Sequence, residues 1–226
     1  MATITWHGHS TFSLQADGYN ILVDPFFSGN PSAKTKAEDV SADFILLTHG
    51  HGDHVGDTLA IAKRTGAQVV GNFEVGNWIM AQGYDNVHQQ HIGGGFQHPF
   101  GHLKLTIAFH GSSMPDGSYG GMPAGLLITS EGKRIYIAGD TALFSDMALI
   151  GQGGLDLAVL PIGDNYTMGP EDGLAAVRLL KPKAVIPCHY NTWPLLAVDV
   201  DDWQAKVSAR TATRPVVPAI DEAYTI

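Results

Sequence analysis

The sequence predicts an α/β protein built as an αββα sandwich, with two sheets in the middle and helices on both outer faces. Short strand patterns alternate with helix patterns along the chain, and strand-rich stretches flank the helices in both halves. No repeat of fixed period and no low-complexity linker interrupts this order. A chain of 226 residues with 44% apolar and 15% charged residues can bury a substantial core. We therefore expect a single domain over residues 1–226.

The first half of the chain contains strand patterns followed by two helix patterns. Alternating or continuous apolar runs bounded by turn residues predict strands over residues 3–6, 11–15, 20–23, 43–47 and 68–71. The first helix is expected over 57–64, with Asp57 as its N-cap and Gly66 beyond its end. The second helix is expected over 74–81 and stops before Gly83.

The second half repeats this mixture of strands and helices. The same patterns predict strands over residues 103–109, 125–129, 134–138, 155–160 and 184–187. The clearest helix pattern covers 170–180, because Pro170 occupies its first turn and Pro182 follows its end. A last helix is expected over 201–210.

Charge and composition exclude several classes of protein. The formal charge of −9 and the lack of a Lys/Arg cluster argue against nucleic acid as a main partner. A single cysteine excludes an intrachain disulfide, and no apolar run is long enough to span a bilayer. No basic segment followed by an apolar one opens the chain, so we expect no signal peptide. We expect a cytoplasmic protein that acts on a small-molecule substrate and contacts no membrane, while assembly into a homo-oligomer stays open.

The most informative motif lies at residues 49–54, which read His-Gly-His-Gly-Asp-His. Imidazole nitrogen and carboxylate oxygen are the atoms that bind borderline metals such as zinc. Structural zinc sites favour cysteine ligands and close all four positions, whereas this chain has one cysteine. The motif therefore predicts a metal site of the open, catalytic kind rather than a structural site or a polar loop.

Four predicted strands end close to a residue that could bind a metal. These residues are His49, His110, Asp140 and His189. Strands of one sheet that end together place their last side chains at one edge, where open sheets usually hold their sites. We therefore expect the four side chains to meet at one edge of the sheet.

These motifs, taken in order, resemble the signature of the metallo-β-lactamase superfamily. The matching stretches are Asp24 in Leu-Val-Asp-Pro, residues 48–54, His110, Gly-Asp-Thr at 139–141, and His189. More closely, residues 6–12, 161–170 and 187–192 resemble a family of predicted metal-dependent hydrolases related to L-ascorbate-6-phosphate lactonase. The resemblance implies the αββα sandwich of the metallo-β-lactamase type.

The resemblance also implies two divalent metal ions. The first would be held by His49, His51 and His110, the second by Asp53, His54 and His189, with Asp140 bridging them. Histidine and carboxylate ligands suit zinc best, and manganese, iron or nickel also fit them. Two such ions a few ångströms apart can share a hydroxide that attacks an electrophile polarised by the same ions.

This combination predicts a binuclear metal-dependent hydrolase of a small ester, lactone or phosphodiester. β-Lactamases of the superfamily use a cysteine ligand and lack the Asp53-His54 ending, so lactamase activity is not expected. Here Cys188 adjoins His189 and reads as a small buried side chain. Two alternatives stay open: an iron-dependent redox enzyme on the same fold, and a non-catalytic metal-binding regulatory protein.

Several residues outside the metal ligands are further candidates. Asp24 is expected to orient a ligand imidazole. His9 could contact substrate or shuttle a proton, with a turn histidine as the alternative. Asp53 is a catalytic candidate as well as a ligand. Tyr190 and Asn191 could donate to a developing oxyanion, with local loop bonding as the alternative, and His91 and Tyr119 are candidates for substrate contact.

Overall fold

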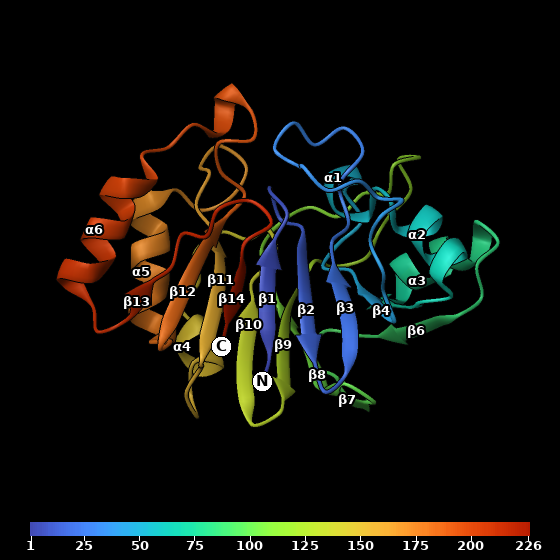
Figure 1. Ribbon diagram of the computed structural model, residues 1–226, viewed down its shortest axis with the longest axis horizontal. Helices are drawn as coiled ribbons and strands as arrows, with labels where there is room; N and C mark the ends of the chain where they lie inside the picture. The colour runs from blue at the N-terminus through green and yellow to red at the C-terminus, as the bar shows by residue number, and fades with distance from the viewer.

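A computed structural model describes residues 1–226 and shows two seven-stranded sheets packed face to face between two layers of helices (Figure 1). This architecture confirms the αββα sandwich predicted from the sequence. In Figure 1, α5 and α6 lie at one side of the molecule and α2 and α3 at the other, with the sheets between them. None of the helices has the length and apolar character that crossing a bilayer requires.

The first sheet has the strand order β14-β1-β2-β3-β4-β5-β6. Its strands are β1 (Thr3–Trp6), β2 (Phe12–Ala16), β3 (Tyr19–Val23), β4 (Phe44–Leu46), β5 (Gln68–Asn72), β6 (Val87–Gln90) and β14 (Ala223–Thr225). The helices of this half are α1 (Gly52–Val55), α2 (Thr58–Thr65) and α3 (Phe73–Ala81).

The second sheet has the order β13-β12-β11-β10-β9-β8-β7. Its strands are β7 (Gly95–His98), β8 (Gly101–Ile107), β9 (Ala124–Ser130), β10 (Lys133–Ile137), β11 (Leu157–Pro161), β12 (Ala184–Cys188) and β13 (Arg214–Pro215). The helices of this half are α4 (Met147–Ile150), α5 (Pro170–Leu180), the 3₁₀ turn η1 (Pro194–Leu196) and α6 (Val200–Arg210).

Both sheets follow one plan, which the sequence does not reveal as a repeat. In each sheet, antiparallel strands come first in the chain and parallel strands follow, most of them joined through helices. The last strand, β14, is the exception, because it pairs antiparallel with β1. The parallel strands β4, β11 and β12 are buried along their whole length, as expected for strands covered on both faces. Their carboxyl ends lie at the edge of the sandwich that carries the candidate site.

Two apolar clusters stabilise this arrangement. The larger one fills the space between the sheets and continues under α5 and α6, where Trp203 and Leu174 are buried. The smaller one packs the first sheet against α2 and α3, through residues such as Ile61, Val75 and Ile79. Each helix layer therefore packs on one sheet, and the two sheets pack on each other through buried apolar side chains.

The sequence missed several short elements. Strands β6 and β7 carry few apolar residues and lie at sheet edges. They form through backbone pairing with a neighbouring strand, so their sequences show no alternating apolar pattern. Strands β13 and β14 and helices α1 and α4 are each two to four residues long, too short for a periodic signal. The strand predicted over 103–109 ends earlier, at Ile107, because the chain leaves the ladder with β9 there.

Candidate metal centre

The His49–His54 motif lies where β4 ends and a single helical turn, α1, begins. β4 pairs with β3 and β5, which fixes the direction in which His49 leaves the first sheet. His51 is the N-cap of α1, and Asp53 and His54 lie within that turn. The helical turn brings the second part of the motif back towards the first, since the rings of His49 and His54 are 4.0 Å apart.

One group of three imidazoles can share a metal ion. Nε2 of His49 lies 3.0 Å from Nδ1 of His51. The ring of His110 lies 5.2 Å from that of His49 and 5.1 Å from that of His51. One nitrogen from each ring falls within 4.8 Å of the others, which is the spacing that a common ion needs.

A second group combines His9, Asp53, His54 and His189, whose ligand atoms also lie within 4.8 Å of one another. His9 donates through Nε2 to Oδ2 of Asp53 at 3.1 Å, and Thr192 donates to its Nδ1 at 2.9 Å. The backbone N–H of His189 donates to the carbonyl of His9 at 3.0 Å. The structure thus places His9 among the ligand atoms themselves, a closer position than the substrate contact or proton shuttle expected from the sequence.

Asp140 joins the two groups. It follows β10 and is buried. Its Oδ2 lies 3.1 Å from Nε2 of His189, 3.4 Å from Nε2 of His54 and 3.5 Å from Nε2 of His110. A single carboxylate oxygen therefore faces imidazoles of both groups.

The side chains present fit divalent metal ions. Nε2 of His54 and Oδ1 of Asp140 are buried and have no hydrogen-bond partner. Buried polar atoms without a partner are rare in proteins, because each costs roughly 1–3 kcal/mol of desolvation. A cation beside these atoms would satisfy both, and nitrogen and oxygen donors are what zinc and similar metals take.

Asp24 orients two of these imidazoles. Its Oδ2 accepts from Nδ1 of His54 at 2.8 Å and from the Thr48 hydroxyl at 2.6 Å. Thr48 in turn accepts from Nδ1 of His49 at 3.0 Å. With Nδ1 occupied in this way, Nε2 of both histidines is left free to face the cluster, so the geometry has the form expected of a carboxylate that orients metal ligands.

Burial and charge shift the pKa values of the cluster strongly. Burial lowers the pKa of His49 well below its usual range, and it lowers the pKa of His9 to about 4. Burial opposes the charged form of His54 as well, but Asp140 and Asp24 outweigh it and raise its pKa well above the usual range. Two buried carboxylates therefore create a potential in which a cation is favoured at this position.

The backbone is in the left-handed region at three residues of the centre. The φ angles are +52° at His9, +45° at Asp24 and +54° at His189. Residues with a Cβ rarely adopt this conformation, and each instance costs of order 1–3 kcal/mol. Such strain is found where a strand must end abruptly and turn its side chain towards a site.

The expectation that one sheet supplies the four strand-end residues is wrong. His49 follows β4 of the first sheet, whereas His110, Asp140 and His189 follow β8, β10 and β12 of the second. The residues still meet, because the two sheets pack face to face and both end at the same side of the sandwich.

The structure does not bring Tyr190, Asn191 or His91 to the cluster. Tyr190 is buried and its ring stacks on Trp6 at 5.3 Å, so it serves packing rather than oxyanion binding. Asn191 accepts from the backbone N–H of Val198 at 2.8 Å, which is the local loop bonding given as the alternative. His91 is exposed and accepts from the N–H of Ile92.

Tyr119 lies at the margin of the centre. It is 71% exposed and pairs with Ser113 in an isolated bridge of the loop that follows His110. The same loop is tied to the histidine motif, since the backbone N–H of Gly50 donates to Ser112 at 3.1 Å. A contact between Tyr119 and a substrate stays a prediction.

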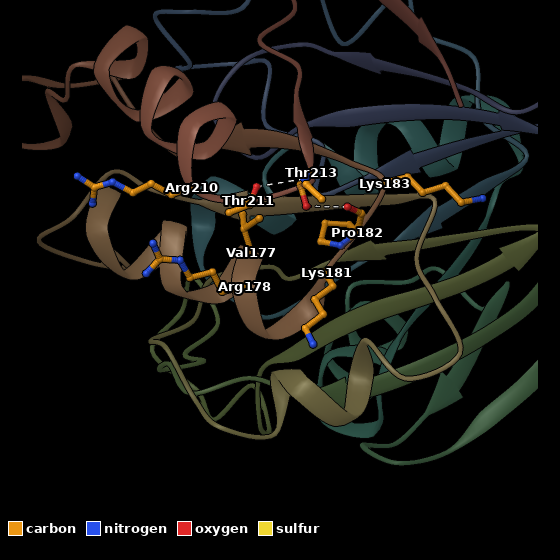
Figure 2. A pocket seen from close by; sticks show the side chains of 9 residues that line it. Val177, Arg178, Lys181, Pro182, Lys183, Arg210, Thr211 and Thr213 are labelled. Carbon is orange, nitrogen blue, oxygen red and sulfur yellow. Dashed lines mark hydrogen bonds between the residues drawn. The ribbon is translucent and has the colours of Figure 1, made fainter.

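A surface cavity lies away from the metal centre. It has a volume of about 620 Å³ and lies at the ends of α5 and α6, where Figure 2 shows Arg178, Lys181, Lys183 and Arg210 around it. Among the residues that line it, Lys183 immediately precedes β12, whereas His189 immediately follows that strand, so the cavity and the metal centre lie at opposite ends of β12. The cavity contains none of the metal-binding groups, so size alone does not mark the chemical site.

Comparison with known proteins places these observations in a family. A family model described as a β-lactamase superfamily domain matches residues 19–190. A UPF0173 metal-dependent hydrolase of Bacillus cereus (strain B4264) is 51% identical over 222 residues, which cover 96% of each chain. A solved metallo hydrolase from the hyperthermophilic archaeon Ignicoccus hospitalis superposes with a TM-score of 0.90 at 35% identity, over 100% of this chain and 99% of that chain.

More distant structures show the fold alone. CmlA, a diiron β-hydroxylase from Streptomyces venezuelae, has a TM-score of 0.78 at 16% identity and covers 100% of this chain and 54% of that chain. The relationship to L-ascorbate-6-phosphate lactonase stays a prediction. The sequence match, the shared fold and the histidine–aspartate cluster lead to one assignment: this chain belongs to the β-lactamase superfamily and, within it, to the UPF0173 family of metal-dependent hydrolases.

Proposed function

We propose that this chain is a hydrolase that holds two divalent metal ions and cleaves an ester, lactone or phosphodiester bond. The observation that carries the proposal is the position of Asp140, whose Oδ2 lies 3.1 Å from Nε2 of His189 and 3.5 Å from Nε2 of His110. A carboxylate shared by two ions must face both sets of ligands in this way. The metal-dependent hydrolases among the relatives support the same class of activity.

Each ion would take its own group of side chains. The first would bind His49, His51 and His110, the second would bind Asp53, His54 and His189, and Asp140 would contact both. Two divalent ions at these positions supply Lewis acidity and lower the pKa of bound water towards neutral pH. Zinc is the metal that this donor set favours, and manganese, iron or nickel could replace it according to supply.

The remaining residues of the centre hold these ligands in place. Asp24 and Thr48 keep the Nε2 atoms of His49 and His54 directed into the cluster. His9 holds the Asp53 carboxylate through its Nε2, and its ring lies within the second group. Ligands that are already oriented lose little freedom when the metal binds.

Metal analysis combined with activity assays tests this proposal. Mass spectrometry of the purified protein should find two divalent ions per chain, and the metal-loaded protein should hydrolyse chromogenic ester, lactone or phosphodiester substrates. Asp140→Ala should lose most activity and part of the metal, whereas His91→Ala, which changes an exposed histidine outside the cluster, should keep both. An unchanged metal content and rate in Asp140→Ala would refute the bridging role.

Two other outcomes would point to another function. Visible absorbance from bound iron together with oxygen consumption would indicate a redox enzyme. A full metal complement without turnover on a wide substrate panel would indicate a metal-binding regulatory protein.

A further inference from the structure

Exposed apolar side chains gather on the loops that carry the metal-binding residues. Nine large apolar side chains are exposed in the whole chain; four of them lie on these loops, and a fifth, Tyr166, lies on the loop that follows β11. The five are Phe109, Tyr119, Met122, Tyr166 and Leu195, with exposed fractions between 44% and 71%. Apolar side chains that are grouped and exposed usually mark a place where a ligand or partner binds.

Phe109 and Phe144 form an aromatic pair beside the centre. Phe109 immediately precedes His110, and Phe144 lies four residues after Asp140. Their rings pack edge to face at 5.4 Å. The backbone holds them there, because the N–H of Phe109 donates to the Thr141 hydroxyl and its carbonyl accepts from Ala142, both at 3.0 Å.

Tyr166 lies on a loop fixed to the same residues. The N–H of Met168 donates to the carbonyl of Thr141 at 3.1 Å, which ties this loop to the residue next to Asp140. Tyr166 is 54% exposed, the same fraction as Phe109. We call Phe109, Phe144 and Tyr166 the apolar shelf.

Five of the loop segments around the centre contain no positively charged side chain, whereas the segment between β3 and β4 contains two. The segments 47–57, 108–123, 138–146, 161–169 and 188–199 contain no Lys or Arg, although the chain has 13. Lys34 and Lys36 lie on the segment between β3 and β4, where Lys36 pairs with Glu38. Phosphate monoesters and polyphosphates are usually recognised by Arg or Lys, and bound metal ions would be the main positive charge available here.

From these observations we propose that the substrate carries an apolar group, aromatic or a short hydrocarbon chain, which binds on the apolar shelf beside the hydrolysed bond. The hydrolysed group itself is neutral or carries a single negative charge. This inference rests on the proposed function, because the metal ions must hold the reacting group. It excludes phosphate monoesters and nucleotide polyphosphates as main substrates.

Binding of simple hydroxamates tests the inference without requiring turnover. Acetohydroxamate and benzohydroxamate share one metal-binding group and differ in a methyl or phenyl substituent. Calorimetric titration of the metal-loaded protein should give a dissociation constant at least tenfold lower for benzohydroxamate, because the phenyl ring removes more apolar surface from water. The Phe109→Ala variant should reduce this ratio to threefold or less, and Phe109→Leu should restore part of it.

Phe96→Ala is the matched control. Phe96 is 47% exposed, and it lies on β7 opposite Leu103, away from the end of β8 that leads to His110. Its removal should leave the preference for benzohydroxamate unchanged.

The possible results separate the inference from the proposed function. Equal affinity of the metal-loaded protein for both hydroxamates would overturn the inference and leave the two-metal hydrolase standing. An equal loss of preference in Phe96→Ala and Phe109→Ala would also overturn it. Failure of the protein to retain metal would instead overturn the proposed function, and the inference with it.

Discussion

Asp24 accepts a hydrogen bond from Nδ1 of His54 at 2.8 Å, and both side chains are buried. The same carboxylate accepts from the backbone N–H and the hydroxyl of Thr48, which in turn holds His49. One carboxylate therefore sets the orientation of an imidazole in each of the two candidate metal-binding groups, although it does not itself face the cluster.

Asp24→Asn should weaken metal binding more than it weakens the fold. Asn removes the negative charge and replaces one acceptor oxygen with an NH2 donor, so the bonds to Thr48 and His54 cannot all form. Partners of this kind typically contribute a factor of roughly 10–100 to metal affinity. Titration with a competing chelator measures this affinity. Asp43→Asn is a suitable control, since Asp43 is an exposed residue just before β4 whose carboxylate accepts only from the backbone N–H and the side-chain amide of Asn20. A variant at Asp24 with wild-type affinity would contradict the orienting role.

Gly163→Ala should damage the centre through the backbone. A Cβ at this position would overlap the carbonyl oxygen of His189, so β11 and β12 would have to separate where the ligand emerges. Overpacking of this kind costs about 1–3 kcal/mol or more, and we expect a lower melting temperature together with weaker metal binding. Gly52→Ala serves as the comparison, because a Cβ there meets nothing within 4 Å despite lying between two ligand residues. Equal melting temperatures for the two variants would show that the close contact between Gly163 and His189 does not affect stability.

His98 should make the fold less stable in mild acid. Its side chain is 2% exposed, stacks on Phe100 at 5.0 Å and donates to Gln90 at 3.1 Å. Burial lowers its pKa from 6.5 to about 4, so the unfolded chain binds a proton more readily than the folded one between these values. The stability contributed by neutral His98 is present above pH 6.5 and is lost as the pH falls towards 4, by about 3 kcal/mol.

Chemical denaturation at pH 7 and pH 4.5 measures this effect as a difference between wild type and His98→Phe. The two proteins share the metal cluster, whose own titration cancels in the comparison. The free energy of unfolding should fall more steeply with acid in the wild type. Parallel pH profiles would show that His98 is not the responsible group.

The sequence was sufficient for the fold class and for most of the long elements. The helix over residues 170–180 was predicted with its observed bounds, because Pro170 and Pro182 fix both ends. Edge strands such as β7 could not be found, since their stability comes from pairing with β8 rather than from an apolar pattern of their own. Side-chain direction was also beyond the sequence: Tyr190 and His189 are neighbours in the chain, yet Tyr190 packs on Trp6 while His189 faces Asp140.

The position of His9 shows a similar limit. Its motif predicts a role near the site, but only the structure reveals that the loop after β1 is held against the end of β12, through the bonds of His9 with the His189 backbone and with Thr192. Contacts between residues so distant in sequence depend on the packing of the two sheets, for which a single sequence carries no direct signal.

The origin of the ligands from both sheets has a consequence for how the protein folds. Each imidazole group draws on residues before and after β7: His49 and His51 with His110 in one case, His54 with His189 in the other. Bringing residues so far apart in the chain together is slow and entropically costly. It must happen before these residues can bind one metal ion. We therefore expect metal to bind in the last stage of folding, after the halves of the chain have docked, and bound metal would then slow their separation.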